Sequence, residues 1–268
     1  MRNSRLDERG AQNIKALARG KLVEYQKLND VIGAQIFSIL EKESKVLYYP
    51  LDYQQVWGFS EIIQGKSFVC INTSIQYDKQ VFAAAHELYH LWFGSSGEIM
   101  ISKDAIEPDA EDETELLANR FAAEFLVNKE LLLQEMQVFG IDKNNLNVKD
   151  IVRLANHFVV PYHTMARRLF ETDVCSNDQF EEYKLYTEEY ASIWRNRLGI
   201  SLPVRKDKIG LSNLIDMAME LYEHDLITYE KLEYLLGFAE LTPKNLGILQ
   251  NKSFTPPTDA ELDAILEE

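Results

Sequence analysis

The strongest constraint on how this chain can fold lies in residues 81–93, VFAAAHELYHLWF. The stretch is apolar almost throughout, yet it contains two of the chain's five histidines and one glutamate. Polar groups that are buried without partners cost free energy, so a core helix of this composition needs a reason to contain them. The sequence therefore predicts a buried helix that also carries a functional site.

Three residues of this stretch, His86, Glu87 and His90, form the pattern H-E-x-x-H. Residues i and i+4 lie on one face of a helix, so both imidazoles can reach one metal ion. Glu87 is rotated by about 100° from His86. It lies where a general base would take a proton from water at the open position of a zinc site. A chance pattern on a buried helix is the alternative, and the helical context favours the metal site.

The third metal ligand that such a site requires is predicted in the next helical segment, residues 113–127. One face of this segment collects four residues at helical spacing: Glu115, Ala118, Asn119 and Ala122. The two alanines would let this helix pack closely against the first, with Glu115 pointing between them. The alternative is a helix cap, because Asp112 and Glu115 have the spacing of a capping box.

Strands are predicted only within residues 45–74, where KVLYYP, QVWGFS and KSFVCIN are short runs rich in β-branched and aromatic residues. Apolar periodicity predicts helices in most of the remaining chain. These helical segments are 10–42 in two pieces, 79–93, 113–127, a pair from Asn147 to about 170, 178–198, 211–223 and 228–237. The expected fold class is α+β and mostly helical. Composition becomes more acidic after about residue 173, so we expect a site-bearing domain of residues 1–172 and a helical, partner-binding or regulatory extension of residues 173–268.

Charge and composition restrict the partners. The formal net charge is −15, and a surface this acidic repels nucleic acid and anionic membranes. It suits a protein that acts on other proteins, although solubility alone would also explain it. No apolar run is long enough for a membrane span, and the N-terminus has no signal region. Cys70 and Cys175 suggest no disulfide framework, so we expect a cytoplasmic protein.

The paired stretches FAAAHELYHLWF and ELLANRFAAEFLV resemble the ImmA/IrrE family of zinc metallopeptidases. In that family an H-E-x-x-H helix follows a strand and precedes a helix with the pattern E-x-x-A-x-x-F-A. The second pattern corresponds here to Glu115, Ala118, Phe121 and Ala122. The resemblance covers roughly residues 10–170.

This resemblance implies a zincin-like core, in which helices pack on a small mixed sheet around the H-E-x-x-H helix. It implies that His86, His90 and Glu115 bind Zn²⁺ and that Glu87 is the catalytic base. It also implies a zinc-dependent endopeptidase whose protein substrate is a regulator, often a helix-turn-helix repressor, in phage, mobile-element or stress control.

The chain departs from the family at three places. Tyr89 stands where the family often has glycine, so it either narrows the site or packs. LWFG lacks a further histidine that often follows the motif, and Leu126-Val127-Asn128 stands where the family often has Leu-Met-Pro.

The residue that donates a hydrogen bond to the oxyanion of the reaction stays open. The candidates are Tyr89, His157, Tyr162 and His163, each of which could instead be an ordinary helix or core residue.

Two alternative functions belong to other classes. VKDIVRLANHFVVPYHTMARRLF could be a helix-turn-helix that places Arg167 and Arg168 on a DNA-reading helix. The acidic chain and the proline in the turn disfavour direct DNA binding. A binding module that sequesters its partner without cutting it is the other alternative, and such a module would not need Glu87.

For a protease, we expect the substrate to add as a strand to the sheet edge near residues 67–72.

Overall fold

The computed structural model describes residues 8–63, 66–94, 100–103, 113–201, 210–211 and 214–249. The chain forms two compact units, residues 1–212 and residues 213–268, called unit 1 and unit 2 below. The helices that the structure describes include none with the length and apolar character needed to cross a membrane.

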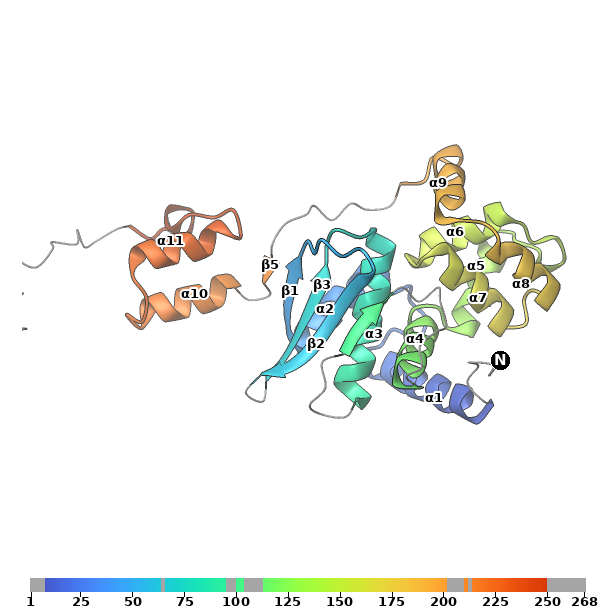
Figure 1. Ribbon diagram of the computed structural model, residues 1–268, viewed down its shortest axis with the longest axis horizontal. Coiled ribbons are helices and arrows are strands. Elements are labelled where there is room, and N and C mark those ends of the chain that lie inside the picture. Colours follow the sequence, from blue (N-terminus) through green and yellow to red (C-terminus); the bar gives the residue numbers. More distant parts are fainter. Residues whose placement is uncertain are drawn as a thin grey trace, which may run out of the picture. The chain divides into compact units, whose positions relative to one another are not determined.

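Unit 1 combines a mixed sheet with helices, which confirms the predicted α+β, mostly helical fold class (Figure 1). Its strands are β1 (Lys45–Tyr49), β2 (Val56–Ile63), β3 (Lys66–Asn72), β4 (Met100–Lys103) and β5 (Gly210–Leu211). Its α-helices are α1 (Glu8–Glu24), α2 (Ile36–Glu43), α3 (Tyr77–Phe93), α4 (Glu113–Leu126), α5 (Lys129–Val138), α6 (Val148–Phe158), α7 (Tyr162–Glu171), α8 (Asn177–Lys184) and α9 (Glu188–Arg197). Short 3-10 turns cover Gly33–Gln35 and Lys143–Asn145.

The sheet has the strand order β4-β2-β3-β1-β5. β1 pairs with β3 in parallel, and the other neighbouring strands are antiparallel. Helix α3 contacts β2, β3 and β4, and its other side packs against α4, which in turn packs against α1 (Figure 1). The helix predicted at residues 79–93 therefore lies between the sheet and a second helix, which explains its apolar sequence.

The strand at residues 67–72 was expected to be a sheet edge that receives the substrate, and this prediction is wrong. β3 is an interior strand, because its register pairs Val69 with Val46 of β1 and with Ser60 of β2. Its backbone hydrogen-bonding groups are used within the sheet. Among the described strands, β4 and β5 form the two edges.

Some helix limits differ from those predicted. α1 continues through Gly20, where an added Cβ would meet no atom within 4 Å. The predicted helix 178–198 is two helices, because the Thr187 side chain caps a new helix start by accepting from the backbone N–H of Tyr190. The predicted start of the helix pair is correct, since Asn147 and Asp150 form a capping box. The proposed cap at Asp112 lies outside the described residues.

The compact units divide after residue 212, whereas the sequence predicts a boundary at 172/173. Five residues beyond that expected boundary belong to the main hydrophobic core: Val174, Cys175, Phe180, Tyr183 and Ala191. Arg195 of α9 also reaches Asp78 in the first turn of α3, with 3.4 Å between Nη2 and Oδ2. The acidic composition after residue 173 thus reflects the solvent-facing sides of α8 and α9, whose other sides pack into unit 1.

Unit 2 is small. It contains α10 (Leu214–Glu223), α11 (Tyr229–Gly237) and a 3-10 turn (Pro243–Leu246). Its core of buried apolar side chains consists of Ala218, Leu232 and Leu236, with partly buried residues around them.

Candidate metal centre

Helix α3 is buried on all sides where it carries the H-E-x-x-H pattern. Every residue from Gln80 to His90 is buried. The helix ends at Phe93, and the N–H of the next residue, Gly94, donates to the His90 carbonyl over 2.9 Å. A Cβ at position 94 would lie 2.5 Å from that carbonyl oxygen, so only glycine fits this helix end without a shift of the last turn. The end of α3 therefore fixes the backbone of His90.

Three side chains from α3 and α4 converge at one point. His90 Nε2 lies 3.0 Å from His86 Nε2. The Glu115 carboxylate lies 3.2 Å from each imidazole, through Oε2 to His86 Nε2 and through Oε1 to His90 Nε2. Ligands bound to zinc at about 2.0–2.2 Å in a tetrahedral site are about 3.3 Å apart, so these spacings fit one metal ion. Among the described residues, the group of His, Cys, Asp or Glu side chains that could hold a metal is His86, His90 and Glu115.

Asn119 orients one of these imidazoles. Its Oδ1 lies 2.8 Å from His86 Nδ1. An amide oxygen accepts a hydrogen bond, so Nδ1 carries a proton and Nε2, the nitrogen that faces Glu115, is the one left to bind a metal ion. Partners of this kind set the tautomer of a metal-binding histidine. The sequence predicts Asn119 on this face of the helix without a role. The signal for its role is its position one turn after Glu115.

The charges around the site favour a cation. Burial raises the pKa of Glu115, but hydrogen bonds from His86 and His90 and their charges outweigh it and lower the pKa to about 2. Burial lowers the pKa of His86, but the hydrogen bond to Glu115 and the charges of Glu87 and Glu115 raise it above its ordinary value. The carboxylates thus stabilise positive charge at the imidazoles, which is the charge that a metal ion would bring.

Glu87, the candidate base, is fully buried on the same helix. Burial, and then the charge of Glu87, raise the pKa of the Cys70 thiol on β3 to about 11. That thiol stays protonated at neutral pH.

Tyr89, which could narrow the site or pack, has an aromatic environment. Its ring centroid lies 5.5 Å from Phe121, 5.6 Å from Phe93 and 5.8 Å from His90. The tyrosine is only 6% exposed. Tyr89 therefore helps to join α3 to α4 through an aromatic cluster, beside the second metal-ligand candidate.

The other candidate oxyanion donors have partners on α5 to α8. The Tyr162 hydroxyl donates to the Tyr183 carbonyl over 3.2 Å. His157 Nε2 lies 3.0 Å from Glu135 Oε2 of α5. His163 packs its ring against Tyr162. The structure does not bring these three side chains into the group formed by His86, His90 and Glu115.

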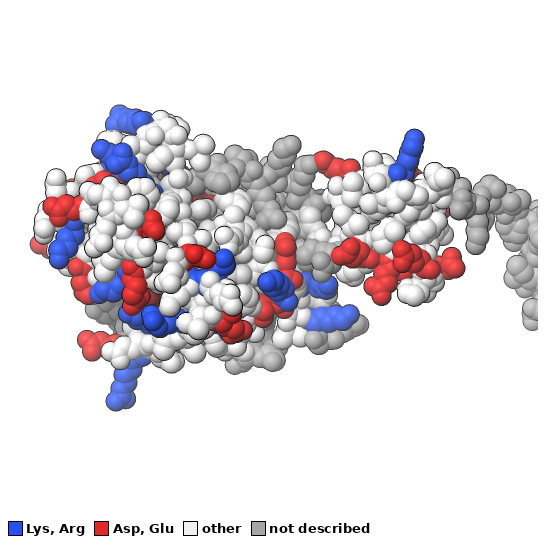
Figure 2. All heavy atoms as spheres, turned by 180° about the vertical axis from the view of Figure 1, so that it is seen from behind, with Lys and Arg blue, Asp and Glu red and all other residues white. Residues whose placement is uncertain are grey.

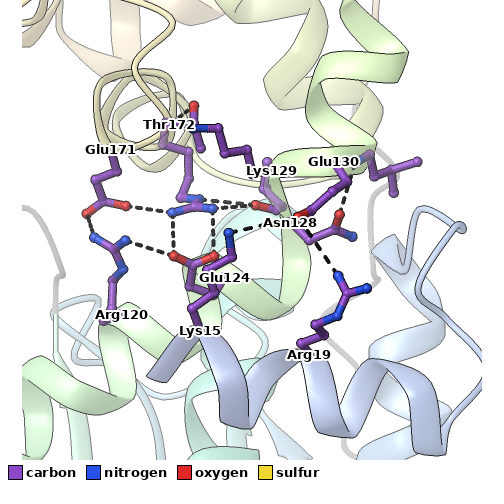
Figure 3. Close-up of polar contacts among 12 residues, drawn as sticks. Lys15, Arg19, Arg120, Glu124, Asn128, Lys129, Glu130, Glu171 and Thr172 are labelled. Carbon is purple, nitrogen blue, oxygen red and sulfur yellow. Dashed lines mark hydrogen bonds and ion pairs between the residues drawn. The ribbon is translucent and has the colours of Figure 1, made fainter. Parts of the chain in front are cut away.

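A buried charge network holds the far half of α4, the helix that carries Glu115 and Asn119. The Arg168 guanidinium of α7 donates to both Glu124 carboxylate oxygens over 2.8 and 3.0 Å, and to the Val127 carbonyl. Arg120 joins Glu124 to Glu171 across the same two helices (Figure 3). Arg168 is 1% exposed, so it cannot contact DNA as the helix-turn-helix alternative requires.

Asn128, at one of the places where the chain departs from the family pattern, caps the next helix. Its side chain accepts from the backbone N–H of Leu131 over 2.9 Å and donates to the Leu28 carbonyl over 3.2 Å. An Asn at this position therefore starts α5 and ties it to the turn after α1.

Comparison with protein families gives one match. Residues 41–170 match the model described as Peptidase M78, IrrE N-terminal-like domain. Neither the curated proteins nor the solved structures contain a match to this chain. The matched segment includes the whole sheet except β5, the three convergent side chains, Glu87 and Arg168, and it stops before α8.

Proposed function

Because this chain belongs to the ImmA/IrrE family of M78 peptidases through residues 41–170, we propose that it is a zinc-dependent endopeptidase that cleaves a regulatory protein. The observation that carries the proposal is the convergence of His86, His90 and Glu115 on one point, with Glu87 next to His86 on the same helix. An open site with two histidines and one carboxylate is the donor set of catalytic zinc in peptidases.

Each residue has a distinct role in this proposal. His86, His90 and Glu115 hold the ion, and Asn119 keeps His86 in the tautomer that can bind it. A bound zinc ion acts as a Lewis acid that polarises a peptide carbonyl and acidifies water. Glu87 takes the proton from the attacking water and delivers it to the leaving amine. The burial of α3 keeps these groups in a region of low dielectric, where their electrostatic interactions are strong.

The substrate that we propose is a transcriptional repressor with a helix-turn-helix domain. The family resemblance supports this choice, and so does the net charge of −15, because DNA-binding proteins present basic surfaces that an acidic protein attracts. If an extended part of the substrate adds to the sheet, β4 is the edge that also contacts α3.

The test compares the wild-type chain with Glu87→Gln on a repressor encoded by a neighbouring gene. Wild type should cut the repressor, a chelator should stop the reaction, and added zinc should restore it. Glu87→Gln should lose about 10²–10⁴-fold in rate, the usual contribution of a general base. Asp142→Asn is the control and should cut at the wild-type rate, because it changes an exposed acid that caps a 3-10 turn of unit 1 and Asn can form the same cap. Repressor that binds wild type without being cut would identify a sequestering module.

A further inference from the structure

Unit 2 exposes more large apolar side chains than it buries. Its fully buried core is Ala218, Leu232 and Leu236. Among the residues of the unit that the structure describes, six large apolar ones are 37–69% exposed: Met217, Leu226, Tyr234, Phe238, Leu246 and Leu249. Exposed apolar surface gathered on a small unit is typical of an interaction site.

Two of these residues form an aromatic pair on α11. Tyr234 and Phe238 lie one helical turn apart, with 5.2 Å between ring centroids. Tyr234 is 60% exposed, and the Nζ atom of Lys231 lies 4.7 Å from its ring centroid. A neighbouring ammonium group therefore already uses one face of this ring as a cation-binding surface. Exposed tyrosine is also one of the residues most often central to protein interfaces.

Exposed carboxylates are frequent on the two helices of unit 2. On α10, α11 and the turn between them, the exposed acidic residues are Asp216, Glu220, Glu223, Asp225, Glu230 and Glu233. Residues 214–237 contain one lysine, Lys231, and no arginine. Figure 2 shows Asp and Glu side chains predominating on the face of unit 2 in view. A unit that exposes both apolar and acidic side chains is complementary to a segment that combines apolar and basic side chains.

The same charge argument selects one occupant. In residues 250–268 of this chain Asp and Glu outnumber Lys, so this tail has a negative net charge, like the helices of unit 2. A second copy of the chain carries −15 and would also be repelled. Nucleic acids are excluded for the same reason.

We propose that unit 2 is a docking site for an amphipathic, positively charged segment of the protein substrate, with Tyr234 and Phe238 as its apolar centre. The proposal rests on the proposed function for the identity of the bound protein. Unit 2 lies outside the matched family domain, so docking there would be separate from the chemistry of α3. Binding at a second, covalently linked unit raises the effective concentration of substrate at the cleavage site.

The test uses the full chain with Glu87→Gln and a fluorescently labelled peptide that forms an amphipathic helix of Leu and Lys. Fluorescence anisotropy should show saturable binding that weakens with added salt. A peptide of the same composition in scrambled order should bind at least about tenfold more weakly, and so should Tyr234→Ser with the original peptide. Tyr53→Ser changes a tyrosine of unit 1 that is 72% exposed, and it should bind like the parent.

Equal binding of the two peptides, or of the parent and Tyr234→Ser, would overturn the proposal. So would binding that appears only after residues 250–268 are removed, because the occupant would then be the chain's own tail. If the parent chain dimerises and Tyr234→Ser abolishes this dimerisation, the occupant of the docking site is a second copy of the chain instead. Peptide binding needs neither zinc nor cleavage, so a chain that cuts its repressor but fails here disproves the docking site alone.

Discussion

Replacing Arg168 with methionine tests how much the buried network between α4 and α7 stabilises unit 1. The side chain of Arg168 is 1% exposed, and that of Glu124 is 5% exposed. Burial lowers the pKa of Arg168, but the charges of Glu171 and Glu124 raise it above its usual range, so the residue is charged. Methionine fills a similar volume but leaves Glu124 without its bidentate partner and removes both donors to the Val127 carbonyl.

The expected decrease in the free energy of unfolding follows from the burial of both partners. Removing one member of a buried ion pair typically costs about 3–5 kcal/mol, because the other charge stays desolvated. Arg120 still reaches Glu124 over 2.8 Å, which places the expected loss toward the lower end of that range. For a unit of this size, each kcal/mol lowers the melting temperature by about 2–4 °C, so we expect a decrease of about 10 °C.

Thermal or urea unfolding of the metal-free chain measures this loss. Arg167→Met is the matched control, because Arg167 is the exposed neighbour on the same helix and should change stability by less than about 0.5 kcal/mol. The double variant Arg168→Met with Glu124→Leu should recover most of the loss, since no buried carboxylate is then left unpaired. Equal stability of Arg168→Met and Arg167→Met would refute the reasoning.

Three further predictions concern the metal centre. Gly94→Ala should lower the free energy of unfolding by about 1–3 kcal/mol, because the added Cβ clashes with the His90 carbonyl, and it should weaken zinc binding. Gly20→Ala, in the open middle of α1, should instead raise the free energy of unfolding by about 0.5–1 kcal/mol. Calorimetry compares the two variants. Asn119→Ala should weaken zinc binding about 10–100-fold in a competition titration, and an unchanged affinity would remove Asn119 from the site. Chelation of zinc should lower the melting temperature, since zinc at 1,000 times its Kd stabilises the fold by about 4 kcal/mol, and the loss should be absent in a chain that binds no zinc.

Local periodicity predicted the elements that carry the site. The i, i+4 spacing of His86 and His90 depends only on helix geometry, and the alanine face around Glu115 predicted close packing of the second helix. The structure places all three side chains together. The three runs of β-branched and aromatic residues also match β1, β2 and β3.

The remaining features depend on contacts between distant parts of the chain, which a single sequence does not show. Nothing in KSFVCIN distinguishes an interior strand from an edge, because the neighbours of β3 lie elsewhere in the chain. β4 and β5 are too short to show a strand period. The predicted boundary at 172/173 differs from the division of the compact units at 212/213, because the acidic faces of α8 and α9 dominate the composition of those helices. Arg168 looked like a DNA-binding residue because its partner, Glu124, lies 44 positions earlier in the chain.

Zinc content measured on purified chains tests the central claim most directly. Wild type and Glu87→Gln should each contain one zinc ion per chain, because the proposed role of Glu87 is that of a base and not of a ligand. Glu115→Ala should bind zinc far more weakly, whereas Glu113→Ala, which changes an exposed residue of the same helical turn, should retain it. Full zinc content in Glu115→Ala, or none in wild type, would contradict a metal centre built from His86, His90 and Glu115.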